Sequence, residues 1–261
     1  MFHTPTASIP TSAWLSDPQT FAVNRLPAHS AHRTNAPTQS LDGTWEVALT
    51  SSSRVTLDSP TTAFDQEAVH SLPVPSTLEA EGLWPPAYVN IQMPWDGHEN
   101  PQAPKPPEEC RVALYRRAFA LHDSLQESLS KKGHARLRFD GFATALYIWV
   151  DGTFVGYCED GYTASEFDIT SALTRSPDHE IVVACYEYSS ASWLEGQDSW
   201  RFHGIFRSVS LVALPACHVA HLATNADYDA DSGMGILNVT VDLMGTKADS
   251  TASAQLTDSS G

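Results

Sequence analysis

The sequence predicts an all-β protein of the jelly-roll type, in which two antiparallel sheets pack face to face. Short apolar runs, alternating or continuous, recur between residues 41 and 215. Asp151-Gly152 separates two of these runs, as a tight hairpin turn would. Only the stretch 122–133 has helical spacing, with Leu125 and Leu129 one turn apart. With 261 residues, the chain is long enough to bury a substantial core.

The individual strands follow from these runs. The run at 181–186 is continuously apolar and predicts a strand buried on both faces. The strict alternation at 136–140 predicts a strand with one solvent-exposed face. The segment 143–158 predicts a hairpin with a type I′ turn at Asp151-Gly152. We expect strands at 41–47, 112–121, 136–140, 143–150, 153–158, 181–186 and 209–213.

The pattern divides the chain into three parts. Residues 1–40 are rich in Pro, Ser, Thr, Ala and His and lack periodicity, which predicts an extended arm lying over a domain or a neighbouring subunit. Residues 41–215 form the predicted sandwich. Residues 216–261 contain two further strand patterns, but an immunoglobulin-like sandwich takes roughly 100 residues. We therefore expect this last part to be an incomplete immunoglobulin-like β-sandwich.

Charge and cysteine content exclude several classes of protein. The net charge of −16 opposes binding to nucleic acid or to an anionic membrane. The longest strongly apolar stretch, 143–150, is too short to span a bilayer, and the first residues do not resemble a secretion signal. The four cysteines form no C-x-x-C pair, so we expect reduced thiols. These observations together predict a cytoplasmic protein.

The segment 193–209 concentrates residues that bind sugars. It holds two Trp, two carboxylates and two Arg between strands. Aromatic rings cover the C–H face of a pyranose, while planar polar groups bind its hydroxyls. The same composition also fits a structural cluster of buried Trp and paired Arg. The carboxylate pairs Glu195/Asp198 and Glu159/Asp160 could be imagined as a glycosidase couple, but nothing in the sequence specifies the required separation.

Short motifs follow one another along the chain. In order, they are N-R-L-P-A-H at 24–29, L-D-G-T-W at 41–45, V-P-S at 74–76, Y-V-N-I at 88–91, E-N-P at 99–101, F-D-G at 139–141, V-G-Y at 155–157, S-E-F-D at 165–168 and L-E-G-Q-D-S-W-R-F-H-G-I-F-R-S-V-S-L at 194–211. This ordered set resembles the large bacterial β-galactosidases of glycoside hydrolase family two. The last motif is the most specific, and its Q-D-x-W-R part is typical of the β-galactosidase branch. Two departures are Gly196, where the family has Asp, and the stretch 51–71.

The resemblance implies a galactose-binding-like sandwich and a role in binding substrate. By this resemblance, Asp198 contacts the galactose 6-hydroxyl and ligates a sodium ion, and Asn90 hydrogen-bonds the sugar. A carboxylate can accept from a hydroxyl and coordinate a hard cation with separate oxygens. An amide offers both a donor and an acceptor.

The resemblance also implies what the chain lacks. The family's nucleophile, its acid/base glutamate and its magnesium ligands lie on a (β/α)₈ barrel further along, so this chain contains no catalytic residue and alone is expected to be inactive. The full enzyme would hydrolyse terminal non-reducing β-D-galactose from lactose-like substrates with retention. Its partners would be the β-galactoside substrate, the catalytic barrel, the C-terminal domains and further copies of itself in a homo-oligomer. The alternatives are a free-standing carbohydrate-binding module and a fragment of a β-glucuronidase or β-mannosidase.

Overall fold

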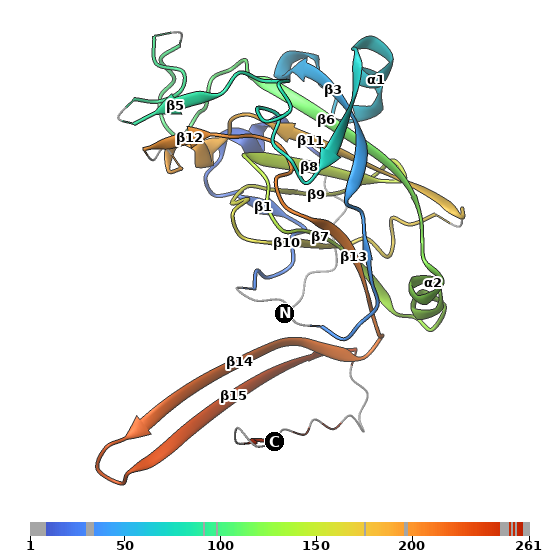
Figure 1. Cartoon of the computed structure of the whole chain (residues 1–261), viewed down its shortest axis with the longest axis vertical. Coiled ribbons are helices and arrows are strands. Elements are labelled where there is room, and N and C mark those ends of the chain that lie inside the picture. The colour runs from blue at the N-terminus through green and yellow to red at the C-terminus, as the bar shows by residue number, and fades with distance from the viewer. Residues whose placement is uncertain are drawn as a thin grey trace.

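The protein is an all-β sandwich with a long hairpin extending from one end (Figure 1). The computed structural model describes residues 9–29, 34–90, 92–97, 99–174, 176–195, 198–245, 251, 253 and 255–257. In this part of the chain, no helix is long and apolar enough to cross a membrane. The predicted fold class is confirmed: two sheets pack around one core.

The larger sheet has seven antiparallel strands. In spatial order they are β1 (Ala22–Val23), β9 (Thr153–Cys158), β8 (Ala145–Val150), β11 (Asp178–Tyr186), β6 (Arg111–Ala120), β3 (Gly43–Ser51) and β4 (Val69–Val74).

The smaller sheet has four strands and closes one side of the core. Side chains such as Ile148 and Val183 from the larger sheet pack in one cluster with Phe139 and Leu211 from the smaller sheet. Because successive strand residues point to opposite faces, each strand sends every second side chain into this layer. The strands, in order, are β10 (Ser165–Asp168), β7 (His134–Phe139), β13 (Val209–Leu214) and β2 (Thr38–Ser40).

The outer face of the larger sheet is also buried. Trp14 and Leu15 lie in a 3-10 helix, Ser12–Ser16, and pack against Tyr147 and its neighbours on that face. Phe64 of α1 (Ala63–Gln66) joins the same cluster. The arm thus lies over the sandwich, and β11 is buried on both faces, as its continuous apolar run predicts. Three residues assigned to the arm, Thr38–Ser40, form the edge strand β2.

The predicted helix and hairpin turn are present. Helix α2 (Asp123–Ser130) buries Leu125 completely. Asp151 and Gly152 both have positive φ, at 48° and 74°, as a type I′ turn requires. Helix α1 and the 3-10 turns at Ser52–Arg54, Pro60–Thr62 and Ser190–Trp193 were not predicted, because a single turn is too short to show helical periodicity.

The last described strands form a hairpin that stands away from the sandwich (Figure 1). Strand β14 (His218–Asp229) pairs with β15 (Met234–Met244) along their whole length. Apolar side chains remain exposed on this hairpin, including Leu222 and Tyr228. In the described part of the chain, these two strands are all that residues 216–261 contribute in regular structure.

The cysteines are free thiols, as predicted. Cys110, Cys158 and Cys185 are buried, whereas Cys217 is exposed. Burial in the core raises the pKa of Cys158 to about 12, which keeps this thiol protonated and unreactive.

Candidate functional site

The candidate site lies on a two-stranded ribbon at one end of the sandwich, opposite the hairpin (Figure 1). Strand β5 (Ala87–Val89) pairs antiparallel with β12 (Ser199–Arg201), with Ser199 opposite Val89 and Trp200 opposite Tyr88. This register determines where the two predicted sugar-binding residues, Asn90 and Asp198, lie. Asn90 comes directly after β5 and Asp198 directly before β12, so both lie at the same end of the ribbon, and both are exposed.

One face of the ribbon carries the polar and aromatic groups together. Side chains alternate across a strand, so Asp198 and Trp200 point to the same side as their cross-strand neighbours Asn90 and Tyr88. The Tyr88 hydroxyl donates a hydrogen bond to Oδ1 of Asp198. This bond, with some desolvation and the charge of Asp198, raises the pKa of Tyr88. The Asp198 carboxylate retains further acceptor positions for a ligand.

Aromatic contacts hold the loops on both sides of the ribbon. Trp95, in the loop after Asn90, is buried and packs edge-on against Trp193 and Tyr188, with ring centroids 5.0 and 5.1 Å apart. The Trp193 indole Nε1 also donates to the Lys105 carbonyl at 2.9 Å. These contacts tie the loop that follows Asn90 to the segment that precedes Asp198.

The opposite face of the ribbon carries Arg201. Its Nη1 donates to the Glu195 carbonyl at 2.7 Å and so links β12 to Glu195. Burial raises the pKa of Glu195 to about 7, and the nearby carboxylates of Glu159 and Asp160 add to this shift, although Arg201 opposes it. Gly196 and Gln197, which the sequence analysis singled out within the specific motif, lie outside the described residues.

The two imagined carboxylate couples have different environments. Glu159 is 2% exposed and accepts hydrogen bonds from the Ser190 hydroxyl at 3.1 Å, the Ala191 amide at 2.9 Å and the Tyr157 hydroxyl. Its oxygens are therefore occupied by the fold. Asp198 is exposed and bonded to Tyr88, whereas Glu195 is partly buried. The Asp198 carboxylate is thus accessible to a ligand, whereas the Glu159 carboxylate is not.

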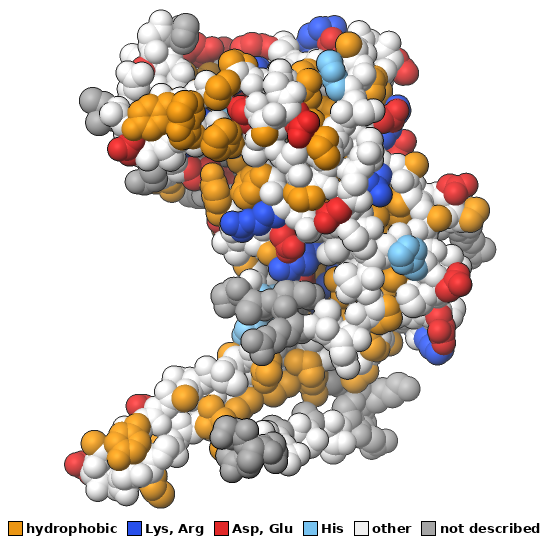
Figure 2. All heavy atoms as spheres, viewed as in Figure 1, with side chains coloured by type: hydrophobic (Ala, Val, Ile, Leu, Met, Phe, Trp, Pro, Cys, Tyr) orange, Lys and Arg blue, Asp and Glu red, His pale blue; other side chains and the backbone are white. Residues whose placement is uncertain are grey.

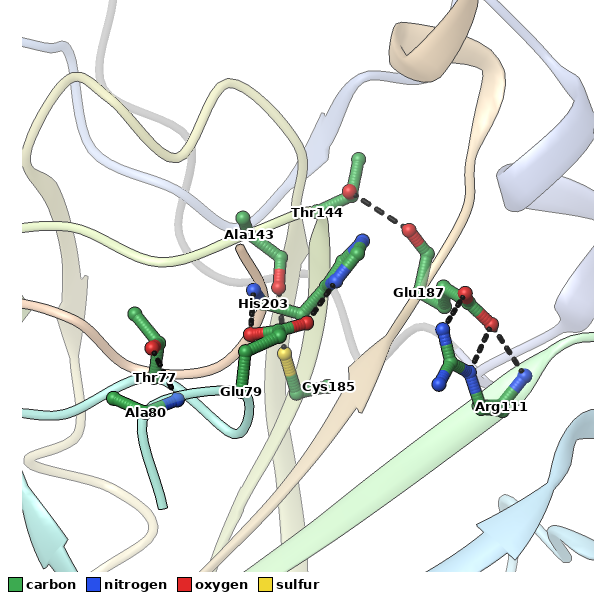
Figure 3. A network of polar contacts seen from close by, with 9 residues as sticks. All are labelled: Thr77, Glu79, Ala80, Arg111, Ala143, Thr144, Cys185, Glu187 and His203. Atoms are coloured by element: carbon green, nitrogen blue, oxygen red, sulfur yellow. Dashed lines mark hydrogen bonds and ion pairs between the residues drawn. The ribbon is translucent and has the colours of Figure 1, made fainter. Parts of the chain in front are cut away.

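A largely buried polar network, which residue spacing did not reveal, includes His203, two residues beyond β12 (Figure 3). Glu79 accepts from the His203 backbone amide at 2.9 Å and contacts His203 Nδ1 at 2.7 Å. Glu187 forms a bidentate pair with Arg111, with distances of 3.0 and 2.5 Å. Burial disfavours the charge on Glu187, but the hydrogen bonds and charge of Arg111 prevail and lower its pKa. Because the partners are far apart in sequence, spacing alone could not reveal them.

The resemblance implies a sodium ion on this face, with Asp198 as one of its ligands. Among the described residues, no three His, Cys, Asp or Glu side chains come together as a metal site would require. Asp198 offers an exposed carboxylate oxygen, which suits a hard cation. The residues present therefore fit one ligand of such an ion.

A β-sandwich that presents a carboxylate, an amide and aromatic rings on one exposed face has the features of a carbohydrate-binding domain. The profile described as "Glycosyl hydrolases family 2, sugar binding domain" matches residues 38–215. The chain therefore belongs to glycosyl hydrolase family 2, as its motifs predict.

Curated relatives carry the name of β-galactosidase. β-Galactosidase BgaC of Bifidobacterium adolescentis is 50% identical over 250 residues, covering 89% of this chain and 24% of its own length. The β-galactosidase of Streptococcus thermophilus is 39% identical, over 95% of this chain and 25% of its own. The β-galactosidase large subunit of Lactobacillus helveticus is 34% identical, over 91% and 41%. The chain thus spans about a quarter of the length of the first two.

Solved structures share the fold at low identity. A β-glucuronidase from Ruminococcus gnavus in complex with uronic isofagomine has a TM-score of 0.53 at 14% identity, covering 85% of this chain and 36% of its own. A β-galacturonidase from Eisenbergiella tayi bound to galacturonate has a TM-score of 0.51 at 18% identity, covering 83% and 30%. These similarities extend to the fold alone.

Proposed function

We propose that this chain is the sugar-binding portion of a longer enzyme, a retaining β-galactosidase that releases terminal β-D-galactose from lactose-like substrates. One observation carries the proposal: the ribbon register sets Asp198 beside Asn90 on an exposed face, with the Tyr88 hydroxyl bonded to the carboxylate. Asp198 would bind the 6-hydroxyl of galactose and Asn90 a second hydroxyl. The nucleophile and the acid/base residue would come from a barrel outside this chain.

The proposal includes metal ions and further subunits. Asp198 would supply one sodium ligand, and residues outside this chain would complete the sodium site and hold magnesium. The description of relatives such as the Lactobacillus helveticus protein as a large subunit supports an oligomeric enzyme. The four free cysteines support a cytoplasmic location.

The test is kinetic and uses the longer enzyme. Asp198→Ala should lower kcat/KM for lactose by about 5- to 150-fold, because losing a hydrogen bond to a buried substrate hydroxyl typically costs about 1 to 3 kcal/mol. The matched control is Asp227→Ala, an exposed carboxylate on the distant hairpin, which should leave kcat/KM unchanged. Unaltered kinetics and an unaltered sodium response in Asp198→Ala would refute the assigned role.

Two measurements separate the alternatives. A panel of nitrophenyl glycosides distinguishes a β-galactosidase from a β-glucuronidase or β-mannosidase, because only the matching glycon is turned over. Calorimetry on the 261-residue chain with galactose addresses the free-standing module. We expect no measurable heat, since part of the pocket would come from the barrel, and tight binding would favour the module.

A further inference from the structure

A row of exposed aromatic side chains continues the face that carries Asp198. Tyr88, Trp200 and Phe202 are 51%, 56% and 44% exposed, which is unusual for rings of this size. Figure 2 shows hydrophobic side chains gathered at the upper left of the molecule, where Figure 1 places β5 and β12. The row therefore begins beside the proposed galactose-binding pair and runs along the ribbon to Phe202, next to the buried His203.

The rings form a contiguous surface. The Trp200 and Tyr88 centroids are 5.6 Å apart, and Trp200 stacks with Phe202 at 6.5 Å with only 20° between the ring planes. Two strand residues span about 7 Å, so Trp200 lies one such step beyond Asp198. That step is comparable to the spacing of neighbouring rings in a disaccharide.

We propose that Trp200 is the platform for the leaving group of the substrate, binding the ring that follows galactose, with Tyr88 and Phe202 on either side. The inference rests on the proposed function. An indole ring stacks well on the C–H face of a pyranose or on an aryl ring, because aromatic faces combine a large apolar area with a negative quadrupole. The hydroxyl-bearing edges of the sugar would remain in water. A neutral ring also suits a protein with a net charge of −16.

The role predicts a selective effect that depends on the leaving group. In the longer enzyme, Trp200→Ala should raise KM about tenfold for lactose and for nitrophenyl galactoside, whose leaving groups are rings. It should not change KM for methyl β-galactoside, whose leaving group has no ring to stack. Trp200→Phe should recover much of the loss. The matched control is Phe21→Ala, because Phe21 is also 56% exposed but lies on the arm.

Several outcomes would overturn the inference. Equal KM changes for the ring and methyl leaving groups would assign Trp200 to the galactose itself, and no change would remove its role. Thermal unfolding provides the folding control: a larger fall in Tm for Trp200→Ala than for Phe21→Ala would show that the row packs against another domain. If the longer enzyme cleaves a sugar other than galactose, only the β-galactosidase proposal is refuted. The role of Trp200 can still be tested, by comparing ring and methyl leaving groups on glycosides of that sugar. Absence of hydrolysis of every glycoside would overturn both proposals.

Discussion

The Tyr88 hydroxyl donates a hydrogen bond to the Asp198 carboxylate, although the two residues are 110 positions apart in the chain. The bond joins strand β5 to the loop before β12 and orients the carboxylate that we assign to the sugar. It also couples the two ionisations, because a tyrosinate would lose the hydrogen bond and stand beside a second negative charge.

The coupling predicts a pKa change. Asp198→Asn should lower the pKa of Tyr88 toward its ordinary value, since the carboxylate is the principal reason that the pKa is raised. The measurement is an alkaline titration of ¹³C-labelled tyrosine by NMR. Asp227→Asn, on the hairpin, serves as the control and should leave the Tyr88 titration unchanged. A Tyr88 pKa that is identical in the wild type and in Asp198→Asn would mean that the bond is absent in solution.

The raised pKa of Glu195 predicts how the stability of the protein depends on pH. Its pKa is about 7 in the folded protein, chiefly because of burial, and about 4.3 when unfolded. Between these values the folded state binds more protons than the unfolded state, so the contribution of Glu195 to stability decreases as pH rises. Glu195→Gln removes this loss. The variant should therefore have a higher Tm than the wild type at pH 8, and the difference should shrink toward pH 5.

The control for this prediction is Glu127, a carboxyl group whose pKa is shifted in the opposite direction. The hydrogen bond and charge of Lys131 lower the pKa of Glu127, which is exposed. Glu127→Gln should therefore leave Tm unchanged or slightly lower at pH 8. A Glu195→Gln variant whose gain in Tm is the same at pH 5 and pH 8 would contradict the raised pKa.

Gly156 predicts a packing effect within β9. A Cβ added there would lie 2.5 Å from a ring carbon of Phe167 and 2.7 Å from the Val23 carbonyl oxygen. Because Phe167 is fully buried and cannot move aside easily, Gly156→Ala should cost about 1 to 3 kcal/mol in the free energy of unfolding. Gly235→Ala, a strand position with no atom within 4 Å, should stay within about 0.5 kcal/mol. Equal urea midpoints for the two variants would refute this explanation.

The hairpin β14–β15 predicts uneven hydrogen exchange. Among the described residues, its strands pair only with each other, and many of their apolar side chains are exposed. Local opening there exposes little additional apolar surface, so its amides should exchange faster than those of β8 and β11, which are buried on both faces. Mass spectrometry of exchange in the 261-residue chain measures this difference. Uniform protection across both regions would show that the hairpin is as stable as the sandwich.

Much of the sandwich could be predicted because its signals are local. The apolar run at 181–186, the Asp151-Gly152 turn and the helical spacing of Leu125 and Leu129 each reflect a period of a few residues. Gly133 shows where local reasoning is incomplete. A glycine directly after a helix commonly has the positive φ of a cap. Here Lys132 has the positive φ, and Gly133 is required because a Cβ would lie 2.5 Å from the Leu214 carbonyl oxygen.

By itself, the sequence determined seven strand-forming segments of the sandwich, the turn type, the reduced cysteines and, through its ordered motifs, the family. It did not reveal the shorter strands, among them β5 and β12 of the ribbon. Only the tertiary structure decided that Asn90 and Asp198 lie together, that Tyr88 bonds to Asp198, and that Glu79 pairs with His203. The physical reason is that periodicity is set by neighbours within a few residues, whereas these contacts join segments more than a hundred residues apart. Their alignment depends on sheet register, which packing of the whole core determines.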